Sequence, residues 1–398
     1  MISLLLVFAI AFLLYGLIPG VGAFAVRSQW RTFRRRMLEV SRLPFVSYFQ
    51  QAGEDRQLGD FRFFGNLESI QGQNRIYINS GRLTVGVELK EVAIYLLPSS
   101  SNRSNNNLFE KLEESLPDEE PRTVLWKRIF SLPAGTKVFV GGAFFSEEGR
   151  GIFRSLPQKP LVVVIYDGDR KTILLRSIWG GRQKNEYWNR YTLPALIGGS
   201  IAMLMTSYIM MGTPFLRFPS LVALCLSVFP IAALLPPGVV FYFLYTWFWK
   251  RARLLRAQRD LFRLPLRYFE ASDTWKQVPY EEQIVSLPTR EPYLLTRRPD
   301  GIVGEELIIR DGGMLSLPEE KRGDYYLFGA LKQSSRRLIE RPQDPMAELV
   351  LVLGDPVLLS KACSRRARRL ELLAALFIFS GLAANLLLVL ALFHYLIR

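Results

Sequence analysis

The chain has few of the side chains on which metal sites and many enzymes depend. Its 398 residues include two cysteines and one histidine. Metal sites of the CxxC or HExxH kind are therefore absent, and a single histidine cannot supply a recurrent general base. We predict no metal site, no cofactor and no catalysis. Cys225 and Cys363 are expected to be unpaired thiols, as in a reducing cytoplasm, and His394 to pack at an interface.

Charge is missing from four long stretches. Residues 2–24, 192–213, 220–248 and 372–396 contain no Asp, Glu, Lys or Arg. Because about 20 apolar residues cross a bilayer, each stretch predicts a transmembrane helix. Pro236 and Pro237 are expected to kink or split the third helix, for which a re-entrant hairpin is the alternative. Arginines follow the first stretch instead of preceding it, so we predict a retained anchor and not a cleaved signal.

Basic residues collect beside these stretches, and their placement predicts a topology. Lys and Arg near span ends stay on the cytoplasmic side, which puts both termini outside and both long connecting segments in the cytoplasm of a bacterial inner membrane. Anionic lipid head groups, and not nucleic acid, are the expected counter-charge for the net charge of +15. The basic residues predicted at the membrane surface are Arg31, Arg34, Arg35, Arg36, Lys250, Arg251, Arg253, Arg365, Arg366, Arg368 and Arg369.

The two connecting segments share a series of short phrases in the same order. RLPFVSYF at 42 matches RLPLRYF at 263, VFVGGAF at 138 matches YYLFGAL at 325, and PQKP at 157 matches PQDP at 342. These matches predict a tandem repeat, with chance similarity of apolar runs as the alternative. The change in spacing locates an insertion at about 99–130 in the first copy. Its Ser/Asn-rich start and acidic middle predict a flexible, exposed excursion.

Each connecting segment consists of short runs rich in β-branched and aromatic residues, which predict a small barrel or sandwich. After the last run of each copy comes an aspartate and then a helical pattern that leads into a span. Asp355 with Pro356 is a helix start signal, and Asp167 or Asp169 would serve in the first copy. Arginine-rich patterns after the first and third stretches predict helical extensions of those spans.

The predicted fold is therefore an α+β membrane protein with four transmembrane helices and two cytoplasmic β-rich domains in tandem. The predicted boundaries are 1–26 for helix one, 27–190 for the first β-rich domain, 191–213 for helix two, 220–249 for helix three, 250–370 for the second β-rich domain and 371–397 for helix four.

Small and polar residues within the spans indicate helix packing. Gly198 and Ala202 form a small-xxx-small pair, which favours close approach of two helices. Asn385 is the most polar residue in the middle of a span. We expect it to form an interhelical hydrogen bond, with a ligand contact as the alternative.

A Val-x-x-Gly-Ala type strand at 138–144, followed by an apolar strand at 160–167 and a helix leading into a span, resembles the GIDE domain. Prokaryotic membrane proteins and the mitochondrial ubiquitin ligases that carry a RING contain this domain. A second set lies at 325–331 and 345–355. The resemblance implies a β-rich unit held between two spans. It does not imply ligase activity, since the clustered Cys and His ligands of a RING are missing.

The function that we expect is that of a non-catalytic membrane scaffold or accessory subunit of a membrane complex. Its two cytoplasmic domains would bind protein partners, and the acidic part of the insertion, 110–120, would dock one of them. The alternative is a transporter or lipid-handling protein with a path along helices two to four. An enzyme using an unseen cofactor is the third possibility.

Overall fold

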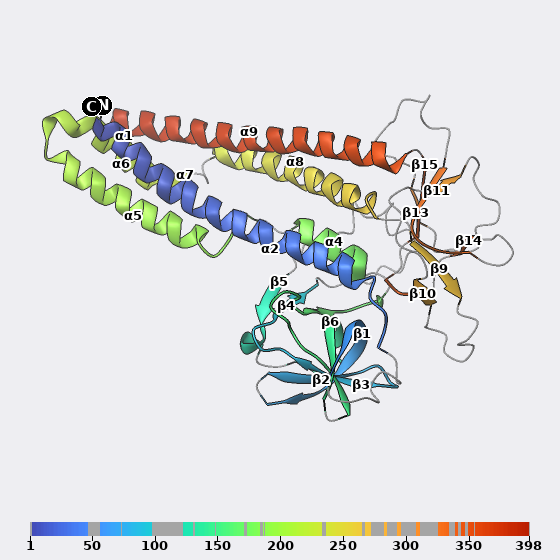
Figure 1. Cartoon of the computed structure of the whole chain (residues 1–398). Helices are drawn as coiled ribbons and strands as arrows, with labels where there is room; N and C mark the ends of the chain where they lie inside the picture. The colour runs from blue at the N-terminus through green and yellow to red at the C-terminus, as the bar shows by residue number, and fades with distance from the viewer. Residues whose placement is uncertain are drawn as a thin grey trace. The chain divides into compact units, whose positions relative to one another are not determined.

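The computed structural model has a mixed α+β fold, as the sequence predicts (Figure 1). It divides into a helical unit, which contains Met1–Arg31, Asn185–Arg256 and Ser364–Arg398, and a unit with both sheets, which contains Thr32–Lys184 and Ala257–Cys363. The structure describes residues 2–46, 56–72, 74–97, 122–129, 132–147, 149–170, 173–183, 186, 188–232, 236–264, 267–271, 282–284, 293–295, 308–310, 325–333, 339–340, 344–346, 349–353 and 355–397.

Among the described residues, three helices are long and apolar enough to cross a membrane. They are Ile2–Val40, Thr192–Met211 and Pro356–Leu392. The first consists of α1 (Ile2–Ala11), the π-helical turn η1 (Phe12–Leu17) and α2 (Ile18–Val40), the second is α5 (Thr192–Met211), and the third lies within α9 (Pro356–Ile397). The first helix therefore continues through the arginine-rich extension predicted after residue 26. In a helix every backbone donor finds an acceptor within the segment, which a bilayer demands.

The predicted third span is not one continuous helix. Residues 217–261 form α6 (Arg217–Ser227), α7 (Phe229–Ala232) and α8 (Pro236–Leu261), and residues 233–235 lie outside the described part. Pro236 and Pro237 occupy the first turn of α8, where the missing backbone donors are harmless. The sequence predicted that these prolines would kink or split the span, and the interruption that the described residues show lies at Val228, between α6 and α7. The turn η5 (Pro214–Leu216) joins α5 to α6, and these two helices pack against each other.

The first β domain contains an eight-stranded sheet in the order β1-β2-β3-β7-β6-β8-β4-β5. Because β1 also pairs with β6, the strands β1, β2, β3, β7 and β6 close into a ring, which is a small barrel. Only the β3–β7 pair in this ring is parallel. The strands are β1 (Arg56–Gln71), β2 (Arg75–Asn79), β3 (Thr84–Glu88), β4 (Ala93–Leu96), β5 (Arg122–Leu125), β6 (Lys137–Glu147), β7 (Arg150–Phe153) and β8 (Val162–Tyr166).

The barrel interior is filled from alternate positions of its strands. Phe61 and Phe63 of β1 belong to the buried core, and the ring of Phe144 lies 5.8 Å from that of Phe61 in an edge-on arrangement. On its other side β6 pairs with β8 up to Gly141 and with β7 from Phe144 onward. Gly142, at φ 147°, lies at this change of partner, where a left-handed backbone favours a residue without Cβ.

The strands β8, β4 and β5 extend the sheet beyond the barrel, and part of the predicted insertion belongs to them. Within 99–130, residues 122–125 form β5, which pairs antiparallel with β4, and Trp126 is buried in the core. This part is therefore ordered, unlike the flexible excursion that the sequence predicted. The acidic part, 110–120, lies outside the described residues.

The end of α2 packs on the outside of the first β domain. Phe33, Met37 and Val40 are buried and recur at helical spacing, which gives α2 an apolar stripe. The ring of Phe33 stacks on Tyr95 of β4 with centroids 3.9 Å apart. A Cβ atom on Gly141 would lie 2.0 Å from Val40, so glycine allows the helix to approach β6 this closely.

The second β domain contains a seven-stranded sheet in the order β10-β9-β13-β15-β12, with β11 and β14 also paired to β13. Four of its pairings repeat the first sheet in direction and in order along the chain. The pairs β11–β13, β13–β14 and β13–β15 are antiparallel, like β1–β6, β6–β7 and β6–β8, and β12–β15 is parallel, like β4–β8. The strands are β9 (Arg267–Ala271), β10 (Glu282–Ile284), β11 (Tyr293–Leu295), β12 (Ile308–Arg310), β13 (Tyr325–Gln333), β14 (Ile339–Glu340) and β15 (Leu349–Leu353).

The two sheets differ outside this shared set. The strands β2, β3 and β5 have no counterpart among the described residues of the second sheet, while β9 pairs parallel to β13 beside β14. Ile94 of β4 lies opposite Val163 of β8, as Ile308 of β12 lies opposite Val350 of β15. The shift from the first copy to the second is thus 187 residues for β8 but 214 for β4, so the extra chain of the first copy lies between β4 and β8.

The helix after the last strand differs between the copies. In the second copy α9 begins at Pro356, and the Asp355 carboxylate accepts a hydrogen bond from the backbone nitrogen of Val357 at 2.7 Å, as the sequence predicts. In the first copy the helical pattern forms α4 (Ile173–Gln183), which ends before α5 begins at Thr192. Asp167 binds Arg176 at 2.9 Å.

Candidate functional site

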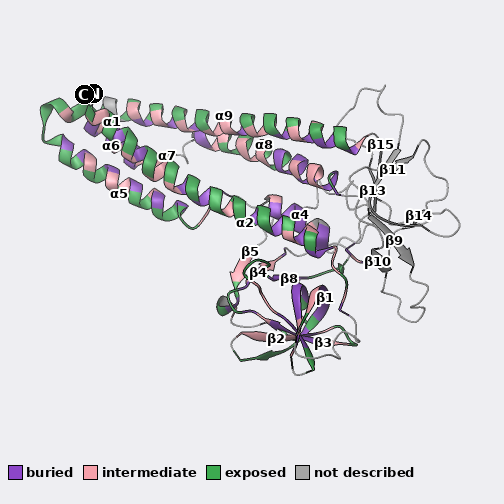
Figure 2. Cartoon of the chain, in the orientation of Figure 1, coloured by how far each residue is buried: buried purple, intermediate pink, exposed green. Residues whose placement is uncertain are grey.

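Many residues along α1, α5 and α9 are exposed (Figure 2), and large apolar side chains are among them. Phe24, Tyr208 and Phe379 are among the large side chains left exposed. A single soluble domain rarely leaves so continuous an apolar surface in water. The unit therefore presents a surface that requires a non-aqueous or protein environment.

Aromatic rings and guanidinium groups meet within α8 and directly before α5. Their polar heads and apolar bodies suit the boundary between membrane and water. The distances from guanidinium carbon to ring centroid are 4.2 Å for Arg251 and Trp247, 3.9 Å for Arg253 and Trp249, and 4.6 Å for Arg190 and Tyr191.

Two further ion pairs join elements within the helical unit. The nitrogens of Arg253 lie 3.4 and 3.5 Å from the carboxylate oxygens of Glu186. Arg256 binds Glu371 of α9 with two bonds of 3.1 and 2.7 Å. The paired, planar geometry makes these contacts directional. The sequence analysis missed Glu186 and Glu371, although isolated acids beside basic clusters were a usable signal.

In the unit that carries the sheets, Asp260 of α8 is contacted by arginines from three helices. Arg182 of α4 donates to one carboxylate oxygen at 2.8 and 2.5 Å, and Arg259 donates to the other at 3.0 and 2.6 Å. Arg34 of α2 lies 3.9 Å from the same carboxylate and donates to the backbone oxygen of Gly181. This arginine cluster around Asp260 links α2, α4 and α8.

The electrostatics of the cluster favour a charged carboxylate. Burial alone would raise the pKa of Asp260, but the charges of Arg182 and Arg259 and their hydrogen bonds outweigh it and hold the pKa below its usual value. The carboxylate is thus matched by an excess of positive charge.

The basic residues predicted at the membrane surface fall into three groups by burial. Arg34 and Arg253 are buried, at 8% and 5% exposure, and their guanidinium groups serve contacts within their units. Arg36 is half-buried. The sequence could not distinguish the buried arginines from the exposed ones, because the partner helices determine which face of each helix is buried. The exposed members are Arg31, Arg35, Lys250, Arg251, Arg365, Arg366, Arg368 and Arg369.

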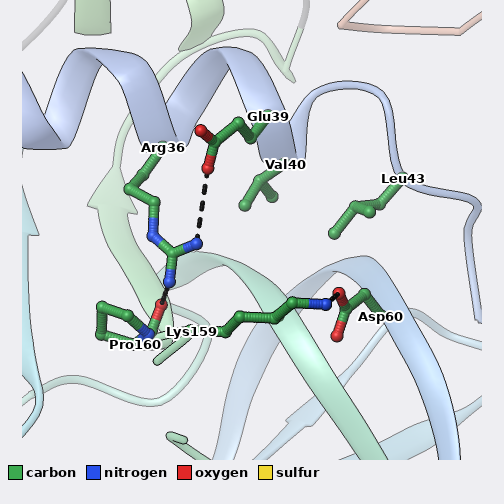
Figure 3. A pocket seen from close by; sticks show the side chains of 8 residues that line it. Arg36, Glu39, Val40, Leu43, Asp60, Lys159 and Pro160 are labelled. Carbon is green, nitrogen blue, oxygen red and sulfur yellow. Dashed lines mark hydrogen bonds and ion pairs between the residues drawn. The ribbon is translucent and has the colours of Figure 1, made fainter. Parts of the chain in front are cut away.

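A small pocket of about 120 Å³ lies where the end of α2 meets the barrel (Figure 3). Arg36 donates to the backbone oxygen of Pro160 at 2.9 Å and lies 3.4 Å from Glu39, while Lys159 donates to Asp60 at 2.6 Å. Two cations face two carboxylates, so the pocket has no net charge with which to select an ion. The lining residues are Arg36, Glu39, Val40, Leu43, Asp60, Gly142, Lys159 and Pro160.

The predicted packing residues have different outcomes. Asn385 of α9 is buried, and its side-chain oxygen accepts a hydrogen bond from the backbone nitrogen of Gly238 at 3.2 Å, which is the expected interhelical bond. A Cβ atom on Gly198 would meet nothing within 4 Å, so the predicted pair with Ala202 makes no close helix contact among the described residues. Gly199 makes that contact, since its Cβ would lie 2.5 Å from the ring of Tyr15.

The described residues contain no group of three or more His, Cys, Asp or Glu side chains that could hold a metal ion. Cys225 and Cys363 are buried and form no disulfide. The side chain of His394 lies outside the described part of the chain.

The chemical role that this arrangement of arginines and carboxylates supports is to hold helices together through ion pairs. Arg34 and Arg253 were predicted for the membrane surface. They contact the carboxylates of Asp260 and Glu186, which the prediction missed, each within its own unit. Comparison of the chain with protein-family models, with curated proteins and with solved structures finds no match, so its function has to be argued from these contacts alone.

Proposed function

We propose that the chain is an integral membrane protein that carries two β-rich domains at the cytoplasmic surface of a bacterial inner membrane. It acts there as a non-catalytic scaffold or accessory subunit of a membrane complex. The observation that carries this proposal is the apolar outer surface of the helical unit, bordered by arginines stacked on tryptophans. Such a surface fits a bilayer, with the stacked pairs at its boundary.

The arrangement of the helical unit supports the proposed topology. Both chain ends lie at the same end of this unit, and so does the turn between α5 and α6 (Figure 1). The chain therefore leaves this end in α1, returns in α5, leaves again in α6 and returns in α9. With the basic residues gathered at the other ends of the helices, the positive-inside rule favours termini on the outside.

The common pairings of the two sheets support a tandem duplication. Antiparallel β6 and β8 with parallel β4 recur as β13, β15 and β12. A GIDE-like unit held between two spans remains part of the proposal, on the strength of the strands at 138–144 and 160–167 and the helix that follows them.

A scaffold needs surfaces for protein partners, and the first copy offers one that has no counterpart among the described strands of the second. The strand β5 pairs with β4 on one side and forms the edge of its sheet. Edge strands and adjacent segments are common docking places for other chains. We assign partner binding to this edge together with the acidic segment 110–120 that precedes it.

A pull-down from native membranes, followed by mass spectrometry, tests the scaffold. The wild-type chain should bring down a stoichiometric protein partner. A variant with six acidic residues neutralised should lose it, while a variant with the same acids rearranged within the segment should retain most of it. Absence of any stoichiometric partner would contradict the scaffold, and retention by the neutralised variant would contradict the docking segment. The six residues are Glu110, Glu113, Glu114, Asp118, Glu119 and Glu120.

One observation favours a transporter or lipid-handling protein as the second candidate. The predicted third span is interrupted at Val228, between α6 and α7, and Asn385 of α9 binds the backbone at the start of α8. Broken helices within a membrane often line solute paths. Solute or lipid flux in proteoliposomes, lost in Asn385→Leu but retained in Ser380→Ala, would favour this candidate over the scaffold.

A further inference from the structure

The motif Pro-Gln-Xaa-Pro occurs once in each copy, and its third residue changes sign. The first copy has Lys159 in PQKP at 157–160, and the second has Asp344 in PQDP at 342–345. Each motif comes shortly before a corresponding strand, β8 or β15. The two motifs are therefore matched in position but opposite in charge.

Both motifs contact the same strand of the first β domain. Phe61 and Phe63 of β1 belong to the barrel core, so the alternating residues Asp60 and Arg62 lie on the outer face. The amine of Lys159 donates to Asp60 at 2.6 Å. A guanidinium nitrogen of Arg62 donates to the carboxylate of Asp344. The face of β1 thus presents an acid to one motif and a base to the other.

The two contacts differ greatly in burial. The side chain of Lys159 is 57% exposed, and a pair so open to solvent contributes little. The side chains of Arg62 and Asp344 are 4% and 5% exposed. Loss of one partner of such a pair leaves an uncompensated buried charge, which is strongly destabilising.

Further contacts fix the geometry of the buried pair. The guanidinium of Arg62 lies 4.1 Å from the ring centroid of Phe45. The second carboxylate oxygen of Asp344 accepts a hydrogen bond from the backbone nitrogen of Met346 at 2.9 Å, and Met346 is fully buried. Each charged group is therefore held in position by a neighbour from its own copy of the β domain.

We infer that the outer face of β1 is a docking surface for the second β domain of the same chain. The ion pair between Arg62 and Asp344 holds the two domains together, and we call this pair the latch. The sign of the charge at the third position of each Pro-Gln-Xaa-Pro motif decides which residue of β1 it binds. The latch joins the two copies of the β domain, which the Asp60–Lys159 contact within the first copy cannot do. This inference does not depend on the scaffold function.

Charge reversal in the full-length protein, purified in detergent, tests the latch. Amide hydrogen exchange at residues 344–346 reports opening of the contact. Arg62→Glu and Asp344→Lys should each accelerate this exchange by roughly a hundredfold. The double reversal R62E/D344K should be better protected at Met346 than D344K alone, because both variants lack the carboxylate that accepts the Met346 hydrogen bond and only the double variant restores opposite charges. Single reversals without an effect, or a double variant no better protected than D344K, would overturn the inference.

If the charge-reversed variants do not fold, the milder substitution Asp344→Asn provides a second test. Asparagine can still accept the hydrogen bond from Met346 but loses the charge that faces Arg62. It should accelerate exchange at 344–346 and leave β15 protected, and no change would overturn the inference. Lys159→Ala is the matched control and should leave exchange at 344–346 as in the wild type.

Mass measurement by light scattering identifies the source of the second domain. The contact within one chain predicts that the wild type and R62E have the same number of chains per particle. A wild-type dimer that R62E separates into monomers would show that the docked domain comes from another copy, and would overturn the assignment to the same chain.

Discussion

At the scale of single residues, charged side chains of this protein act mostly through partners from other elements. Asp260 binds Arg182 and Arg259, and Arg256 binds Glu371. Because these pairs are largely withdrawn from water, removal of one partner costs more than it would at an exposed pair. Residue-scale predictions therefore concern stability.

The lowered pKa of Asp260 predicts a pH dependence. A carboxylate whose pKa is lower in the folded than in the unfolded state stabilises the fold above its unfolded pKa, and loses this contribution as the pH falls through the folded pKa. The melting temperature should therefore decline as the pH is taken below about 4. Circular dichroism melts between pH 7 and pH 3 measure it, and Asp260→Asn should show a smaller decline over that range.

At neutral pH, Asp260→Asn tests whether a buried ion pair contributes more to stability than an exposed one. Asp260→Asn should lower the free energy of unfolding by about 3 kcal/mol, because it leaves the neighbouring arginines without their counter-charge. Glu39→Gln is the control, since Glu39 is half-exposed beside Arg35 and Arg36, and should change stability by less than about 0.5 kcal/mol. Equal effects of the two substitutions would contradict the assigned role of the cluster.

At the scale of elements, close approach depends on glycines whose importance the sequence did not reveal. Gly198 stands one residue before Gly199, and a step of one residue turns the side chain about 100° around a helix. The small-xxx-small pattern therefore selected Gly198, which has no close neighbour among the described residues. Which face packs was decided by the position of Tyr15 in another helix.

The contact of α2 with β6 gives a test of this kind. Gly141→Ala should destabilise the protein by about 1 to 3 kcal/mol, because the added methyl group would lie 2.0 Å from Val40 and the well-packed interface must shift. Gly198→Ala adds the same group where nothing lies within 4 Å, and should be neutral or stabilising by about 1 kcal/mol. Thermal unfolding of both variants in detergent measures the difference, and a neutral Gly141→Ala would refute the close contact.

Local signals predicted elements well where neighbours in sequence decide the outcome. Asp355 and Pro356 predicted the start of α9, and the arginine-rich residues after position 26 form helix up to Val40. Apolar composition did not locate the interruption at Val228 within 220–249, because composition reports the length of an apolar stretch but not where a helix is interrupted. The helical pattern predicted after β8 appears as α4, and the span begins separately in α5.

At the scale of the whole molecule, the proposed topology places both β domains on one side of the membrane. Single cysteines at positions 120 and 320 test it in a background where Cys225 and Cys363 are replaced by alanine, with Thr213→Cys as the control for the outer side. A membrane-impermeant maleimide should label Thr213→Cys in intact cells. It should label Glu120→Cys and Glu320→Cys only after lysis. Labelling of 120 and 320 from opposite sides would refute the tandem arrangement.

The sequence alone determined the α+β class, the apolar helices, the β-rich character of the first domain and the order of matching phrases in the two copies, because runs of apolar residues and short-range periodicity depend only on neighbours along the chain. The tertiary structure decided which arginines are buried, which glycine lies in a contact, and that Arg62 meets Asp344. These outcomes join residues that are far apart in sequence. They depend on how separate elements pack, which no local pattern encodes.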